Sequence, residues 1–225
     1  MTYRLFSSSD LERISQAVRE AERKTSGEIV PYVVDQSDQY GEAAWRGGAV
    51  LGAATLVIIA VLHLASDTWL GIGPAEISIL TLGAIGLGVT LTHWLPSLKR
   101  LLAGNDLLEH RVAQRAAQAF IAEEVFQTKD RTGIMLFLSL LERKVLAVGD
   151  SGINAKVDQS EWEDVVASIT RGVGEGKPAD GLIEAIGKCG LLLQKRGVAR
   201  SRKDRNELSN QLRVGGKKAA RRKRR

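Results

Sequence analysis

The stretch that decides the fold is Gly47–Leu64, which reads GGAVLGAATLVIIAVLHL and contains no Asp, Glu, Lys or Arg. A second stretch of this kind follows at Ile77–Leu95, ISILTLGAIGLGVTLTHWL. As a helix each would be about 27 to 28 Å long at ~1.5 Å per residue, which matches the hydrocarbon core of a bilayer. We therefore expect a transmembrane helical hairpin at residues 43–98. The alternative is a pair of buried core helices in a soluble protein.

The residues that flank the two stretches predict how the hairpin is oriented. Arg46 precedes the first stretch and Lys99 and Arg100 follow the second, whereas residues 65–76 between them contain no Lys or Arg. The positive-inside rule then places both ends of the chain in the cytoplasm, with two spans in the cell membrane. Tryptophans at the ends of the stretches predict anchors in the membrane interface: Trp45, Trp69 and Trp94.

Glycines predict that the two helices pack closely. Gly48 and Gly52 form a small-xxx-small pair in the first stretch, and the second stretch has glycines at Gly83, Gly86 and Gly88. Small residues let two helix backbones approach each other within a membrane.

The remaining sequence predicts an α/β domain in two parts, residues 1–42 and 99–195. Periodicity predicts one helix and one strand before the hairpin, and a helix, two strands in a β-hairpin and two more helices after it. The first strand is Glu28–Val34, in which Pro31 indicates a sheet edge or a bulge. A strand, helix and strand in this order imply a parallel, right-handed crossover, into which the transmembrane hairpin is inserted.

The basic charge of the chain is concentrated at its C-terminal end. Residues 195–225 contain 14 of the 32 Lys and Arg residues and 2 of the 26 acidic residues, so the rest of the chain carries a net charge of −6. Few apolar residues occur there, which predicts a disordered tail at residues 196–225. We expect anionic lipid to bind its terminal cluster: Lys217, Lys218, Arg221, Arg222, Lys223, Arg224 and Arg225. Nucleic acid is a weaker candidate, since no aromatic residues lie between these charges.

Several segments together resemble the TPM domain family. They are a helix that leads into Thr25-Ser26-Gly27-Glu28-Ile29-Val30, the strand segment Arg131–Ser139 with Glu142–Val145 after it, and Asp150-Ser151-Gly152-Ile153. The family occurs in thylakoid proteins of photosystem repair, in an acetylcholine-receptor accessory protein and in many bacterial membrane proteins. The resemblance covers residues 8–195 and implies a TPM-like mixed-sheet α/β sandwich that a two-helix transmembrane hairpin interrupts, as in a subgroup of bacterial inner-membrane proteins.

The chemistry-bearing residues leave two functional hypotheses. Residues 171–178 lack the first glycine and the Ser or Thr of a phosphate-binding loop, so that motif is rejected. The topology predicts that Glu28, Asp130 and Asp150 gather at the membrane-distal end of the sheet, where three carboxylates suit Ca²⁺. No other cofactor is expected. Cys189, the sole cysteine, fits a buried thiol.

The first hypothesis is a membrane accessory protein whose cytoplasmic TPM-like domain binds another membrane protein or complex. This hypothesis is favoured because the strong sequence features concern placement in the membrane and none concerns catalysis. The alternative is a weak metal-dependent acid phosphatase, an activity that the resemblance to the TPM family allows.

Overall fold

The chain divides into two compact units. A computed structural model describes residues 5–65, 71–198 and 207–215. The α/β unit consists of Met1–Ser37 with Arg111–Arg225, and the helical unit consists of Asp38–His110. The helical unit therefore interrupts the α/β unit in the sequence, as predicted. It also extends past residue 98, where the sequence analysis ends the hairpin, because the next helix packs against both helices of the hairpin.

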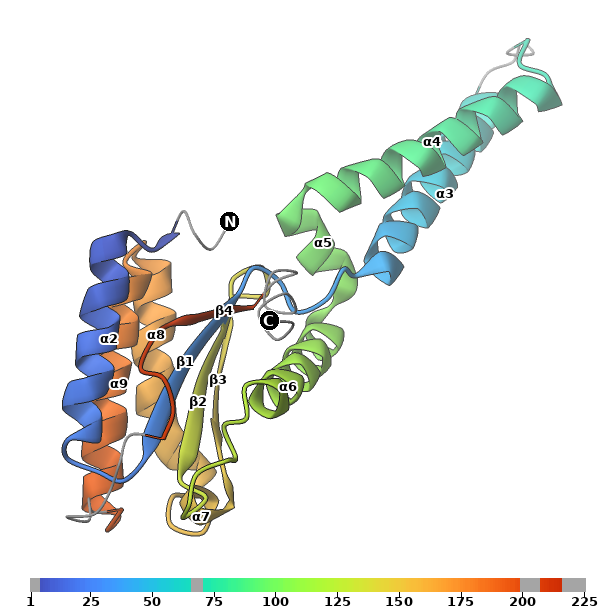
Figure 1. Cartoon of the computed structure of the whole chain (residues 1–225). Coiled ribbons are helices and arrows are strands. Elements are labelled where there is room, and N and C mark those ends of the chain that lie inside the picture. Colours follow the sequence, from blue (N-terminus) through green and yellow to red (C-terminus); the bar gives the residue numbers. More distant parts are fainter. Residues whose placement is uncertain (1–4, 66–70, 199–206, 216–225) are drawn as a thin grey trace, which may run out of the picture. The chain divides into compact units, whose positions relative to one another are not determined.

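The α/β unit is built on a four-stranded mixed sheet, in the order β3-β2-β1-β4 (Figure 1). Strand β1 (Glu28–Val34) pairs in parallel with β2 (Gly133–Ser139), and β2 pairs antiparallel with β3 (Lys144–Gly149). The predicted parallel pair and β-hairpin are thus confirmed. The fourth strand, β4 (Arg213–Gly215), is parallel to β1.

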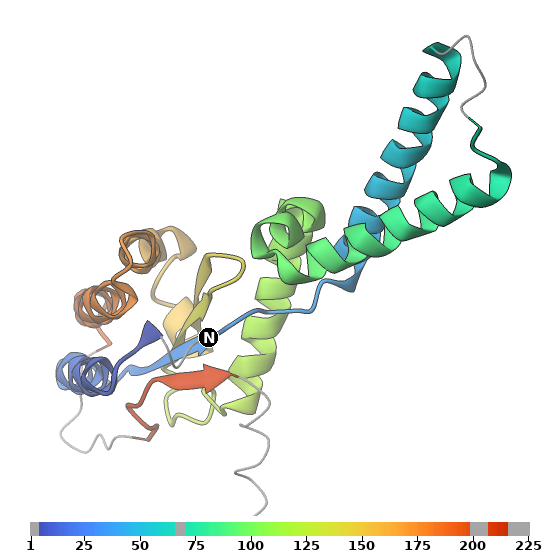
Figure 2. The ribbon, with the colours of Figure 1, turned by 90° about the horizontal axis from the view of Figure 1, so that it is seen from above.

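Helices cover both faces of this sheet. The helices α2 (Ser8–Glu22), α8 (Glu163–Gly174) and α9 (Pro178–Lys195) form one layer, and α6 (Asn105–Ala122) lies on the other face (Figure 2). The short α7 (Ser151–Asn154) and η1 (Gln159–Trp162) connect β3 to α8. Because both faces are covered, successive side chains of β1 and β2 are all buried. This explains why both strands are continuous apolar runs.

Pro31 lies where a proline breaks no ladder hydrogen bond. The backbone N–H of Glu28 donates to Thr132 of the β2 side, and the N–H of Ile29 donates to the Glu22 carboxylate on the opposite side. Successive residues of a parallel strand point alternately to the two neighbouring strands, so the nitrogen of Pro31 faces the β4 side. Pairing with β4 begins only at Tyr32. Pro31 is therefore at a local sheet edge, as the sequence predicts.

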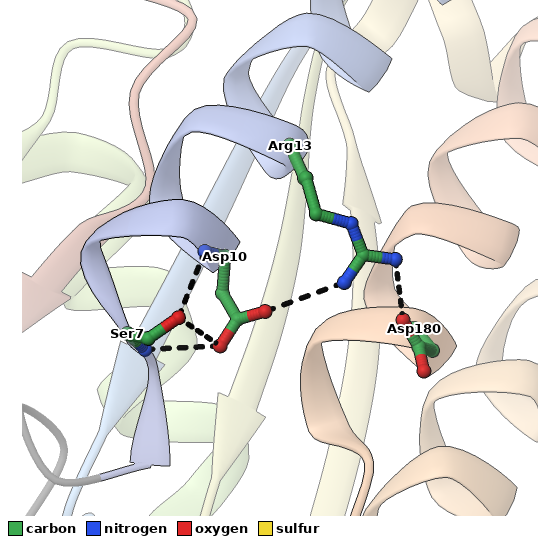
Figure 3. A network of polar contacts seen from close by, with 4 residues as sticks. All are labelled: Ser7, Asp10, Arg13 and Asp180. Carbon is green, nitrogen blue, oxygen red and sulfur yellow. Dashed lines mark hydrogen bonds and ion pairs between the residues drawn. The ribbon is translucent and has the colours of Figure 1, made fainter.

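The first turn of α2 is joined to α9 by the polar network in Figure 3. The Ser7 hydroxyl accepts from the N–H of Asp10 at 3.1 Å, and the Asp10 carboxylate accepts from the N–H of Ser7 at 3.0 Å. This capping box holds the pKa of Asp10 below its ordinary value, chiefly through the Ser7 backbone N–H. Arg13 bridges Asp10 and Asp180 at 3.3 and 2.6 Å.

Residues 207–215 return to the sheet and differ from the predicted disordered tail. The buried Glu28 carboxylate accepts hydrogen bonds from the N–H groups of Glu207 at 3.1 Å and Leu208 at 3.3 Å. Farther along, Arg213 forms an ion pair with Glu123 at 3.1 Å. These partners are distant in the sequence, and only the folded chain brings them together. The terminal cluster, residues 217–225, lies outside the described residues.

The helical unit contains α3 (Gly41–Ala65), α4 (Pro74–Trp94), α5 (Pro96–Ala103) and the first residues of α6. Helices α3 and α4 pack against each other, with close approach between residues 47–52 of α3 and residues 81–92 of α4, and α5 contacts both. Pro74 and Pro96 occupy the first turns of α4 and α5, where a missing N–H costs no helical hydrogen bond.

Candidate membrane-spanning hairpin

The helices α3 and α4 are long and apolar enough to cross a membrane. Only 11% of the most apolar window of each helix is buried. Large apolar side chains are exposed along both, among them Leu64 at 86% and Ile79 at 70%. Aliphatic surface of this extent is unusual on a soluble monomer and typical of a surface that contacts lipid or another protein. Similar side chains on the two helices are Val50, Leu56, Val57, Ile58, Val61, Leu62, Leu80, Leu82, Leu87 and Leu91.

Glycines form the contact between α3 and α4. A Cβ added at Gly88 would lie 2.4 Å from the carbonyl oxygen of Gly47 and 2.9 Å from the Cα of Gly48. Gly52 faces the Ile85 side chain in the same way, at 2.6 Å. The predicted small-residue packing is therefore confirmed at these positions. It is wrong for two others, since a Cβ at Gly83 or Gly86 meets no atom within 4 Å.

Hydroxyl groups within the two helices bond to their own backbone. The Oγ1 atoms of Thr55 and Thr81 donate to the carbonyl oxygens four residues earlier, at 2.9 and 2.8 Å. The same bond is made by Thr90 at 2.8 Å and by Thr92 at 2.9 Å. A hydroxyl paired in this way can enter a hydrocarbon environment without an unsatisfied polar group.

Aromatic and basic side chains mark one end of the hairpin. Trp45 is 70% exposed and Trp94 is 77% exposed, and the two lie where α3 begins and α4 ends. Trp69, the third predicted anchor, is outside the described residues. Arg46, Lys99 and Arg100 belong to the same end of the unit, because a Cβ at Gly47 would touch both Thr92 of α4 and Leu102 of α5.

The side chains of Arg46 and Lys99 have specific positions in this region. Arg46 Nη1 donates to the carbonyl oxygens of Leu102 at 2.8 Å and Ala103 at 3.1 Å, in the last turn of α5. A cation at this place satisfies free carbonyl groups and interacts favourably with the helix dipole. Lys99 is 8% exposed although it carries a charge. Lys99 is a flanking charge in the sequence, and its burial depends on the packing of α5, which the sequence does not reveal.

The structure does not group the three carboxylates of the predicted metal site as ligands of one ion. Glu28, Asp130 and Asp150 do lie near one end of the sheet, since Glu28 pairs in register with Gly133 and the N–H of Asp150 donates to the Gly133 carbonyl. However, no group of three or more His, Cys, Asp or Glu side chains within residues 5–65, 71–198 and 207–215 is arranged to hold a metal ion. The Glu28 carboxylate instead binds the N–H groups of residues 207 and 208.

Asp150 also has a structural role. Its Oδ1 accepts from the Ser151 N–H at 2.7 Å at the start of α7. Its Oδ2 lies 3.0 Å from Arg131 Nε, an ion pair without the geometry of a hydrogen bond. The structure therefore gives the Ca²⁺ hypothesis no support at these residues.

A polar network at the opposite end of the sheet was missed by sequence reasoning. Glu142, in the β2–β3 turn, is 5% exposed and accepts from the Ser37 N–H at 2.8 Å and from the Ser139 hydroxyl. The Ser37 and Ser139 hydroxyls are 2.9 Å apart. The network joins the end of β1 to the end of β2. No sequence signal distinguishes Glu142 from an ordinary exposed turn residue.

Comparisons with known proteins give a likeness of fold. No protein family matches the chain, and no curated protein matches it either. Among solved structures, the chain is similar to the NMR structure of BA42 protein from the psychrophilic bacterium Bizionia argentinensis, with a TM-score of 0.56. The match covers 93% of this chain and 95% of that one at 18% sequence identity. At this identity the likeness concerns the fold alone.

Proposed function

We propose that this chain is an integral membrane protein whose hairpin α3–α4 crosses the membrane twice and holds the α/β unit at the cytoplasmic surface. The observation that carries the proposal is the exposed aliphatic surface on both helices. Burial of apolar surface contributes about 25 cal/mol per Å², so a lipid environment would stabilise this hairpin strongly. The glycine contact between the helices supports the same conclusion, because close packing of this kind is stabilised by van der Waals contacts and does not depend on the hydrophobic effect.

The charges support a cytoplasmic position for both ends of the chain. Arg46, Lys99 and Arg100 lie at one end of the hairpin, and residues 65–76 at the other end have no Lys or Arg. The pairing of strand β4 concerns the end of the sheet at which the basic tail begins. Gly215 pairs with Val34, so the basic tail leaves the sheet at the end from which β1 leads to the hairpin. On the proposed cytoplasmic side, anionic lipid would attract the basic side chains of the tail.

Cysteine accessibility tests this topology. In a Cys189→Ala background, Ser66→Cys lies between the two helices and Ser160→Cys lies on the exposed surface of the α/β unit. A membrane-impermeant maleimide should label Ser66→Cys in intact spheroplasts and Ser160→Cys only in inverted vesicles. Labelling of both variants from the same side, or recovery of the chain in the soluble fraction after carbonate washing, would refute the two-span topology.

The resemblance to the TPM family supports a second part of the proposal, in which the α/β unit binds another membrane protein. Among the described residues of this unit, the two most exposed large apolar side chains lie on opposite faces of the sheet, Ile121 of α6 at 66% and Leu191 of α9 at 57%. These two positions sample the two faces on which a partner could bind. A photo-crosslinking amino acid placed at each position in native membranes should give one defined adduct from one face. The other face serves as the matched control, and the absence of a defined adduct from both would contradict partner binding.

A further inference from the structure

Within residues 5–65, 71–198 and 207–215, Lys99 is a buried cation without a counter-charge. Its side chain lies in α5 within the helical unit, and the residue is 8% exposed. Among the described residues its ammonium group has no hydrogen-bond or ion-pair partner. Two side-chain atoms of the described residues are fully enclosed and have no hydrogen bond, and the Lys99 Nζ is not one of them. It therefore keeps a small opening to its surroundings while the stem is buried.

Burial of a charge is expensive unless an anion pairs with it. The protein shields part of the ammonium group from water, and a nearby anion would offset the hydration that is lost. Lys99 lies one turn after Trp94, which ends the second apolar helix. If α4 spans the membrane, Lys99 is at the depth of the lipid headgroups. The phosphate of a lipid is the anion present at that depth.

Arg46 of α3 supplies a second cation, which lies at the last turn of α5. Its Nη1 is bonded to the carbonyl oxygens of Leu102 and Ala103, which fixes the guanidinium plane. Among the described residues, its Nε and Nη2 atoms have no partner. Ala103 is four residues after Lys99, so the two positions are about 6 Å apart along α5 and share one buried face. The backbone that Arg46 contacts is therefore one helical turn from Lys99, and two cations at one part of α5 suit a phosphate anion.

We propose that the seam between α3 and α5 binds the phosphate of an anionic lipid headgroup, with Lys99 and the free edge of Arg46 as its ligands. This inference rests on the proposed membrane insertion. The site differs from the basic tail, which would attract the membrane surface in general. The seam holds a single headgroup in a fixed place, because α5 and Arg46 are fixed against α3.

The site is tested with the purified full chain in nanodiscs of phosphatidylcholine, titrated with phosphatidylglycerol and read by native mass spectrometry. We expect phosphatidylglycerol to be retained in preference to phosphatidylcholine, and inorganic phosphate at the same concentration not to displace it. The change Lys99→Met keeps the buried stem and removes the charge, and should weaken phosphatidylglycerol retention about 10-fold, as for the loss of a charged hydrogen bond. The change Arg46→Gln should weaken retention in the same direction.

Two controls make the result decisive. Lys99→Arg keeps the charge and should retain the lipid within about 2-fold of the original chain. Arg100→Met removes an equal charge at the neighbouring position and should have a smaller effect than Lys99→Met. Equal retention by Lys99→Met and the original chain, or equal retention of both lipids, overturns the inference. If instead every variant fails to enter phosphatidylcholine nanodiscs, the proposed membrane insertion itself is refuted.

Discussion

The glycine contact between α3 and α4 gives a prediction with a control in the same helix. The change Gly88→Ala adds one Cβ that would lie 2.4 Å from the carbonyl oxygen of Gly47 and 2.8 Å from its carbonyl carbon. Gly83→Ala and Gly86→Ala add the same group in the same helix, where no atom lies within 4 Å. The three variants therefore make the same chemical change and differ in the atoms that the added Cβ meets.

The size of the effect follows from the distances. Ordinary van der Waals contact begins at 3.4 Å, and the atoms that face Gly88 are backbone atoms that no rotamer change can move. The two helices must then separate locally by about 1 Å, which forfeits a quarter to a half of each nearby dispersion contact. We expect Gly88→Ala to destabilise the hairpin by about 1 to 3 kcal/mol. Gly83→Ala and Gly86→Ala should be neutral or stabilising by up to about 1 kcal/mol, since alanine favours a helix.

The assay is unfolding by SDS in mixed micelles, followed by energy transfer between two dyes. Exposed positions 45 and 94 are suitable after substitution by cysteine in a Cys189→Ala background. They lie two residues from Gly47 and Thr92, which are in contact, so the dyes start close together. For Gly88→Ala, the transfer efficiency should fall at a smaller SDS fraction than for the original chain, because the helix contact is lost earlier. Equal midpoints for Gly88→Ala and Gly83→Ala would show that the close approach of the helices does not stabilise the hairpin.

Three further predictions concern the α/β unit. Leu182 is fully buried, so Leu182→Ala should lower its free energy of unfolding by about 2 to 5 kcal/mol in urea titrations, whereas Leu191→Ala, at an exposed site, should change it little. Burial raises the pKa of the Cys189 thiol, so the native chain should react with a maleimide at least about 100-fold more slowly than the unfolded chain. The Arg171 guanidinium holds the pKa of Glu184 at about 2. The ion pair between Arg171 and Glu184 stabilises the fold fully above the ordinary pKa of 4.5, and this stabilisation is lost as the pH falls toward 2. The difference in Tm between the original chain and Glu184→Gln should therefore shrink over that range. A constant difference would refute the ion-pair origin.

The elements that sequence reasoning predicted depend on local patterns. The two long helices follow from uncharged stretches, and β1 and β2 follow from apolar runs between polar turns. Their parallel pairing follows from the helix that connects them. The position of Pro31 could also be predicted, because a residue without an N–H restricts where a strand can pair.

The features that sequence reasoning missed depend on distant contacts. Strand β4 has three residues in a basic segment, and its formation needs the Glu28 carboxylate and the Glu123 side chain at the right places. For the same reason the hydrogen bonds of Glu28 could not be predicted. A carboxylate at the start of a strand suggests a metal ligand, but backbone N–H groups of a returning segment satisfy it equally well. No periodicity in residues 207–215 reveals that return.

The place of the insertion explains how one chain accommodates both units. Parallel strands need a long connection in any case, and here α6 alone returns the chain along the sheet face to the start of β2. The helical unit is added at the turn between β1 and α6, where extra chain length costs little in loop-closure entropy. Because β4 is parallel to β1, the basic tail leaves the sheet at that same end. The connection to the hairpin and the basic tail therefore both begin at the same end of the sheet, opposite to the end at which Glu28 lies.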